Sequence, residues 1–323
     1  MLENVLPEPP CADAFFTTKK GASVALPLAE GPIADSHTHL SSLRALDPAL
    51  ALARASLAGV RFVVDVVDPT DDGRDPAALL ADLADWQGRA AQMLAAWGAS
   101  GVLDALGQAP VPPRVRLVVG CHPHNASAFD EQAHQAMAEL LAHPLCAGIG
   151  EIGLDYHYDL SPRDVQRAVF EEQLALACEL NAPLSLHIRE AHHEAAPLME
   201  RVGVPQAGAV LHCFDLGPDD AAPFQALGCV LGIGGAVTFK RNEPTRDAVA
   251  QASRGGLVTE TDAPYMAPEP LRGTPCEPAM TARTMRFIAD LRAEQRDEKP
   301  SDCYAAAYER AVELFDGPTP LTS

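Results

Sequence analysis

The positions of apolar residues along the chain switch repeatedly between two patterns. A short apolar lead-in at 32–34 is followed by the polar strand-like stretch DSHTHL at 35–40, and short apolar runs of strand length occupy residues 60–67, 115–120, 146–151, 183–187, 210–212, 229–233 and 257–261. Segments in which apolar residues recur every three or four positions, as on one face of a helix, lie at 47–59, 77–96, 131–142, 162–180, up to 199, 218–227, 245–253, 278–295 and 301–315. The pattern therefore predicts eight strands that alternate with helices.

This alternation is typical of parallel strands joined by helical crossovers, the α/β class. A chain of 323 residues is long enough for a closed (β/α)8 TIM barrel, which we take as the predicted fold. A doubly wound open sheet also accommodates the alternation, but it does not explain why polar residues gather at the strand ends.

Two segments lie outside the regular alternation. Residues 1–31 are interrupted by proline and glycine, and we expect a loop or surface arm there. Residues 68–114, between the second and third strands, contain an additional helical segment followed by a Gly- and Pro-rich stretch. The predicted organisation is an N-terminal arm over 1–31 and a barrel over 32–323 with an insertion at 68–114.

Composition bears on the cellular compartment of the protein and on the class of substrate that it can bind. The eight cysteines form no Cys-x-x-Cys pair, and the N-terminus has no signal-peptide order, so we expect a reduced, cytoplasmic protein. No apolar run approaches the length that spans a membrane. The formal charge of −20 repels nucleic acid at long range, so such a substrate needs local basic groups or bridging metal.

Candidate chemistry begins with His37 and His39, which share one face of the first strand about 7 Å apart. Either histidine alone has an ordinary explanation as a polar residue on a half-buried strand. Further polar residues follow the other strands, where a barrel gathers its catalytic groups. They are Glu151, His187, His212 and Asp262, with His122 and His124 just past the third strand.

Imidazole and carboxylate ligands without thiolates suit Zn²⁺, Mn²⁺ or Mg²⁺. Four histidines and two acids exceed the needs of one tetrahedral ion, and two ions about 3.5–4 Å apart would use them all. Such a pair activates water without a serine or cysteine nucleophile. Cys213 follows His212 directly and is expected to pack behind the site.

These residues stand in motifs that resemble the TatD family of metal-dependent hydrolases. The matching motifs are DSHTHL at 35–40, GCHPH at 120–124, GIGEIGLDY at 148–156, PLSLHIREA at 183–191, LHCF at 211–214, GCVLGIGGAVTF at 228–239 and ETDAPYMAP at 260–268. They cover about residues 33–316 in order. The resemblance implies a (β/α)8 barrel, divalent metal and hydrolysis of DNA phosphodiester bonds from an end.

The same resemblance implies roles for individual residues. His37, His39 and Asp262 would hold one metal, and His187 with His212 would complete a second site. Glu151 would bridge the two ions, and Asp262 would also accept the proton of the attacking water. The substrate-facing positions are His122 and Arg189, where an ion pair with Glu190 or Glu194 is an equal alternative for the arginine.

The chain also departs from the family pattern. Cys276 stands where the family usually has asparagine before Glu-Pro, and Arg272 is the one basic residue kept in the preceding segment. The arm and the acidic insertion are additional. These departures bear on nucleic acid as the substrate more than on hydrolysis itself.

The sequence hypothesis is a two-metal hydrolase of the deoxyribonuclease type, acting on DNA ends. An alternative keeps the barrel and metals but acts on a small acyl or phosphate ester or amide. A third hypothesis, a non-catalytic binding protein on the same barrel, fits less well because all six ligand types are present. For Asp35, two residues before His37, we expect an outer hydrogen bond to a ligand imidazole.

Overall fold

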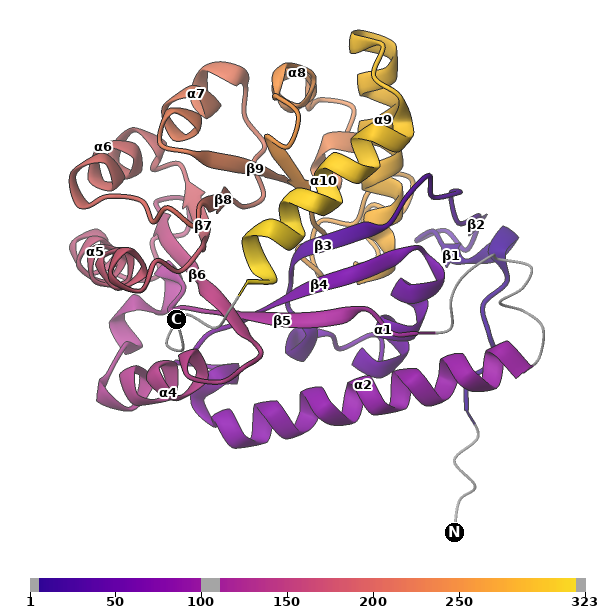
Figure 1. Cartoon of the computed structure of the whole chain (residues 1–323), viewed down its shortest axis with the longest axis horizontal. Coiled ribbons are helices and arrows are strands. Elements are labelled where there is room, and N and C mark those ends of the chain that lie inside the picture. Colours follow the sequence, from indigo (N-terminus) through magenta and orange to yellow (C-terminus); the bar gives the residue numbers. More distant parts are fainter. Residues whose placement is uncertain (1–5, 100–110, 318–323) are drawn as a thin grey trace.

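The computed structural model describes residues 6–99 and 111–317 and shows a barrel of parallel strands surrounded by helices (Figure 1). The eight strands pair in chain order. They are β3 (Ile33–Thr38), β4 (Val60–Val67), β5 (Arg114–Val119), β6 (Cys146–Asp155), β7 (Leu184–Arg189), β8 (Ala209–Leu211), β9 (Cys229–Ile233) and β10 (Leu257–Thr259). The predicted (β/α)8 fold is confirmed.

The barrel closes where the last strand meets the first. Thr38 forms a parallel bridge with Ala263, whose carbonyl accepts a 2.9 Å hydrogen bond from the His39 amide. The amide of Asp262 donates to the His37 carbonyl at 2.9 Å. Closure therefore places the residues after β10 directly beside the histidines of β3.

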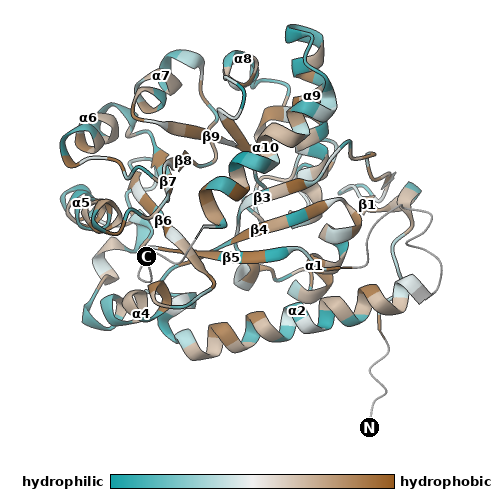
Figure 2. Cartoon of the chain, viewed as in Figure 1, coloured by the Kyte–Doolittle hydropathy of each residue, from teal (hydrophilic) through white to brown (hydrophobic). Residues whose placement is uncertain are grey.

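Helices cover the outside of the barrel, with hydrophilic outer faces and apolar strands within (Figure 2). The α-helices are α1 (Pro48–Leu57), α2 (Pro76–Ala99), α4 (Glu131–Leu141), α5 (Arg163–Leu180), α6 (His192–Val202), α7 (Pro218–Ala226), α8 (Glu243–Gln251), α9 (Thr281–Arg296) and α10 (Pro300–Phe315). Individual residues determine where these helices begin and end. The Asp47 carboxylate accepts hydrogen bonds from the first backbone amides of α1, and Asn181 takes a left-handed conformation after α5.

The barrel interior is filled by one face of each strand. On β4, Phe62, Val64 and Val66 join the inner cluster, whereas Val63 and Val67 pack outward against the helices. This alternation is the period of two expected for a strand that is buried on both faces. The end of α10 contributes Ala311, Leu314 and Phe315 to the same inner cluster.

The N-terminal arm is ordered against the barrel rather than being a simple loop. It forms a short hairpin of β1 (Phe16–Thr17) and β2 (Ser23–Val24). Arg54 of α1 donates to the Phe15 carbonyl at 2.8 Å, and its guanidinium lies 4.4 Å from the centre of the Phe15 ring. Phe15 and Phe16 are 3% and 2% exposed, so the arm is part of the hydrophobic core.

The predicted helix at 77–96 is present as α2, which packs along α1 on the flank of the barrel (Figure 1). Trp97 near its end donates to the Pro7 carbonyl of the arm at 2.9 Å. Part of the Gly- and Pro-rich stretch falls in residues 100–110, outside the described residues. The division into arm, barrel and insertion stays a prediction.

None of the described helices is both long and apolar enough to cross a lipid bilayer.

Phe315→Ala tests the contribution of α10 to the barrel interior. Phe315 is fully buried, so its truncation leaves a cavity and is expected to lower the free energy of unfolding by about 3–5 kcal/mol. Urea denaturation followed by circular dichroism measures this loss. Leu28→Ala is the control, because Leu28 is 77% exposed and should change stability by less than about 0.5 kcal/mol. Equal stabilities of the two variants would contradict the assignment.

Candidate metal centre

The barrel brings all six predicted ligand residues to its carboxyl end. Their side chains form overlapping groups in which nitrogen and oxygen atoms lie within 4.8 Å of one another. His37 lies in β3, Glu151 in β6 and His187 in β7. His39 and His212 directly follow β3 and β8, and Asp262 lies three residues after the end of β10.

Glu151 lies at the centre of these groups, and its two oxygens face different histidines. Oε2 is 3.4 Å from His37 Nε2 and 3.7 Å from His39 Nε2. Oε1 is 2.6 Å from His187 Nδ1 and 3.3 Å from His212 Nε2. One carboxylate therefore connects two separate sets of nitrogen ligands.

Burial and charge act in opposite directions on Glu151. The residue is 4% exposed, and burial alone would raise the pKa of its carboxyl group. The surrounding imidazoles outweigh burial and hold the pKa of Glu151 well below its usual range. The carboxyl group is thus ionised and its oxygens can face positive charge on both sides.

Asp262 completes the set around His37 and His39. Its Oδ1 lies 3.4 Å from His39 Nε2. Burial alone would lower the pKa of His39, but the hydrogen bond and charge of Asp262, together with the charge of Glu151, raise it to about 9. A proton and a metal ion would compete for this nitrogen, since a ligating imidazole must be neutral.

Three buried polar side chains lie next to the ring nitrogens that His37, His187 and His212 turn away from Glu151. They were not predicted from the sequence. Ser185 Oγ lies 2.9 Å from the Nδ1 of His37. Asp155 Oδ2 lies 3.1 Å from the Nε2 of His187, and Glu260 Oε1 lies 3.2 Å from the Nδ1 of His212. Such partners fix the tautomer and orientation of a metal-ligating imidazole.

A signal for one of these residues was present in the strand period. Ser185 precedes His187 by two positions in β7. A residue two positions before a ligand on a strand points to the same side of the sheet, so the spacing places Ser185 on the face of the site. Glu260 and Asp262 follow the end of β10, where this period does not apply.

The expected outer role of Asp35 is wrong. Its carboxylate accepts hydrogen bonds from the Thr261 amide at 2.8 Å and the Thr261 hydroxyl at 2.7 Å. Asp35 therefore fastens the segment before Asp262 to β3, and Ser185 occupies the position expected for it at His37.

His122 also reaches the centre, with its Nε2 3.5 Å from Glu151 Oε1. Its Nδ1 accepts the His124 amide at 3.1 Å, so the neutral ring carries its hydrogen on Nε2. Burial lowers the pKa of His122 to about 4 and keeps the ring neutral. An Nε2–H group is a hydrogen-bond donor rather than a metal ligand.

Arg189 lies at the exposed end of β7, and its guanidinium stacks 4.8 Å from the Tyr158 ring centre. The two acids expected as alternative partners of Arg189 bind other side chains. Glu190 pairs with His157 at 2.6 Å, and Glu194 bonds the Tyr156 hydroxyl at 2.8 Å. Within the described ranges, neither acid pairs with Arg189.

The donor atoms of these residues suit a divalent metal ion. His37 Nε2 is buried and has no hydrogen-bond partner in the described structure, although it faces Glu151 Oε2. An uncompensated nitrogen of this kind is costly unless a ligand or ion satisfies it. The nitrogen and oxygen donors favour Zn²⁺, Mn²⁺ or Mg²⁺ over ions that need thiolates. Burial raises the pKa of the Cys213 thiol well above its usual value, which disfavours a thiolate there.

Comparison with known proteins gives a family and a fold. The family model for TatD related DNase matches residues 34–315. The chain is 36% identical over 184 residues to the 3'-5' ssDNA/RNA exonuclease TatD of Pantoea vagans, covering 55% of this chain and 71% of that protein. It is 31% identical over 265 residues to a metal-dependent hydrolase, TatD, of Mycobacterium tuberculosis, covering 80% and 89% of the two chains.

Among solved structures, YjjV, a TatD homologue from Escherichia coli, superimposes with a TM-score of 0.72 at 25% sequence identity. The match covers 90% of this chain and all of that one (100%).

Glu260→Gln tests the outer partner of His212. Loss of the carboxylate charge at Nδ1 should weaken Mn²⁺ binding by about 10–100-fold. Isothermal titration calorimetry of the metal-stripped protein measures the affinity. Glu243→Gln, at a largely exposed acid of α8, is the matched control and should leave the affinity unchanged. An unchanged Mn²⁺ affinity in Glu260→Gln would contradict the role.

Proposed function

The chain belongs to the TatD-related DNase family, and we propose that it hydrolyses phosphodiester bonds of single-stranded nucleic acid from an end. The observation that carries the proposal is the position of Glu151, with one carboxylate oxygen toward each set of histidines. The exonuclease of Pantoea vagans supports the choice of substrate.

In this proposal two divalent ions bind at the centre. His37, His39 and Asp262 would hold one ion, and His187 and His212 would hold the other, with Glu151 as a shared ligand residue. When bound, Mg²⁺, Mn²⁺ or Zn²⁺ ions supply a Lewis acid for the phosphoryl group and lower the pKa of water. Activity measured with each ion in turn distinguishes among them.

Asp262 is the proposed proton acceptor. Burial alone would raise the pKa of Asp262, but its hydrogen bond to His39 and the charges of nearby histidines lower it below the usual value. The carboxylate is thus ionised and lies at the mouth of the barrel, where it can take the proton of an attacking water. No serine or cysteine nucleophile is required.

His122 is the proposed donor to the substrate. Its Nε2–H points toward the same oxygen of Glu151 that faces His187 and His212. From this position a neutral imidazole can donate to a phosphate oxygen or to the leaving oxygen. Metal ligation by Nε2 would instead cost the hydrogen bond from the His124 amide.

Cations at the mouth of the barrel can offset the acidic surface. Arg189 follows His187 by two positions, and Lys240 and Arg241 follow β9. All three are exposed, and none has an ion-pair partner among the residues described. They provide the local basic groups that phosphate binding requires in a chain of net charge −20.

A small acyl or phosphate ester or amide is the second candidate substrate, favoured by the overall acidity of the chain. The same metal centre would serve it. We also propose a cytoplasmic location, because all eight cysteines are free thiols, as in proteins of reducing compartments.

Glu151→Ala tests the reaction. The wild type, supplied with Mg²⁺, Mn²⁺ or Zn²⁺, is expected to shorten end-labelled single-stranded DNA, and the variant should lose at least about 10³-fold in kcat. Glu139→Ala, at an exposed position of α4, should keep full activity. A panel of small esters and amides assayed in parallel separates the two substrate classes. Full activity of Glu151→Ala, or wild-type action on the small substrates alone, would reject the nuclease.

His122→Ala separates donation from metal binding. We expect kcat to fall by about 10²-fold because the donor is removed, while metal stoichiometry stays that of the wild type. Elemental analysis of the variant supplies the second readout. Loss of one metal equivalent would show that His122 is a ligand instead.

A further inference from the structure

A cavity of about 290 Å³ lies on the flank of the metal centre. Three segments that are distant in sequence form it: the N-terminal hairpin, the connection after β3 and the connection after β10. Its lining includes Phe15, Thr17, Leu43, Arg44, Pro264 and Thr274. Ligand pockets run from about 300 Å³ upward, so the space suits one group of the size of a nucleobase.

Chain connectivity places this cavity next to the proposed metal ligands. Pro264 follows Asp262 by two residues, and Leu43 follows His39 by four. A chain spans at most about 3.6 Å per residue, so these lining residues lie within about 7 Å and 14 Å of the ligand residues along the backbone.

The walls of the cavity are held firmly. Glu277 accepts two hydrogen bonds of 2.7 Å from Arg54, which also bonds the Phe15 carbonyl. This bidentate pair ties the hairpin, α1 and the start of the last helices together. The apolar wall is therefore preformed.

Each of the three segments that form the cavity carries at least one cation. Lys19, in the hairpin turn, lies over the loop after β10: its Cδ is 3.4 Å from the position that a Cβ on Gly273 would take. Arg44 lines the cavity and donates to the Ser41 carbonyl, and Arg272 stacks 4.2 Å from the Phe239 ring centre. Within the described residues none of the three cations has an ion-pair partner.

We propose that this arm groove, formed by the hairpin, Arg44 and residues 264–274, binds the single strand next to the phosphate being cleaved. The cavity accepts one base, and Lys19, Arg44 and Arg272 contact the neighbouring phosphates. Cations without an ion-pair partner in the described part of the chain, on the segments that form a partly apolar pocket, match a nucleotide strand, which combines charged phosphates with apolar bases. The proposal rests on the proposed nuclease function and assigns its strand-binding surface.

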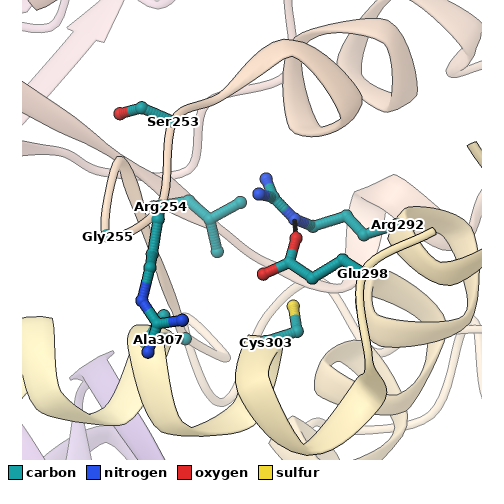
Figure 3. A pocket seen from close by; sticks show the side chains of 9 residues that line it. Ser253, Arg254, Gly255, Arg292, Glu298, Cys303 and Ala307 are labelled. Atoms are coloured by element: carbon teal, nitrogen blue, oxygen red, sulfur yellow. Dashed lines mark hydrogen bonds and ion pairs between the residues drawn. The ribbon is translucent and has the colours of Figure 1, made fainter. Parts of the chain in front are cut away.

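A much smaller cavity lies at the opposite end of the barrel, beside Gly255, Arg292 and Cys303. Its volume of about 10 Å³ is at the lower limit of the space that one water needs (Figure 3). Arg292 in that region is paired with Glu298. The exposed Lys299 next to it provides a matched control cation far from the metal centre.

The test compares a strand with a substrate too small to reach the groove. The double variant Lys19→Gln, Arg272→Gln is assayed on single-stranded DNA of about 12 nucleotides and on bis(p-nitrophenyl) phosphate. We expect KM for the strand to rise about 10-fold relative to the small diester. The slope of log KM against log salt should fall by about 0.7 for each phosphate that the variant no longer neutralises, about 1.4 in all.

Lys299→Gln should change neither quantity. Ala45→Trp, at an exposed position that lines the cavity, provides an independent variant and should raise KM for the strand by filling the base pocket. An unchanged KM and salt slope in both groove variants would overturn the proposal while the nuclease function stands. A wild type that cleaves the small diester but not the strand rejects the proposed nuclease function, and the groove proposal with it. A wild type that cleaves neither rejects the proposed function itself.

Discussion

The structure depends on a buried carboxylate that must be surrounded by nitrogen atoms. A charge buried as far as that of Glu151 destabilises the folded state unless nearby polar or charged groups compensate it. Four strands provide those partners, because histidines stand in or just after β3, β7 and β8 and in the turn after β5. The barrel is the scaffold that lets residues so far apart in sequence face one point.

The histidines around Glu151 in turn need polar partners of their own. The imidazoles that face Glu151 present their second nitrogen to other polar side chains: Ser185 behind His37, Asp155 behind His187 and Glu260 behind His212. Each outer residue is itself buried. Ring orientation is thus fixed before any ligand binds, which is what a precise site needs.

The architecture was predictable from the sequence because the apolar patterns of the strands and of the helices are both strong. Val60–Val67 and Cys229–Ile233 were placed with their observed bounds, since their apolar runs end abruptly. The hairpin of the arm escaped prediction, because its strands have two residues each and depend on packing of Phe15 and Phe16 against α1. Such tertiary contacts leave little local pattern.

The site was predictable as a set of ligand types but not in its connections. Six histidine and carboxylate residues at strand ends indicated a metal centre, whereas the roles of Asp35 and Glu260 depend on which side chains meet in space. Asp35 reaches Thr261 across 226 positions of sequence, a contact that no local pattern encodes. The direction of the His122 ring likewise depends on the backbone amide of His124, in the helical turn that follows His122.

Closure of the barrel between β3 and the segment after β10 also sets an order of events during synthesis. His37 and His39 emerge early from the ribosome, but Asp262 and its anchor Thr261 follow more than two hundred residues later. The first ligand set is incomplete until the last strand has been made and has joined the first. A chain that ends before Asp262 therefore lacks one of the proposed ligands and cannot assemble the full centre.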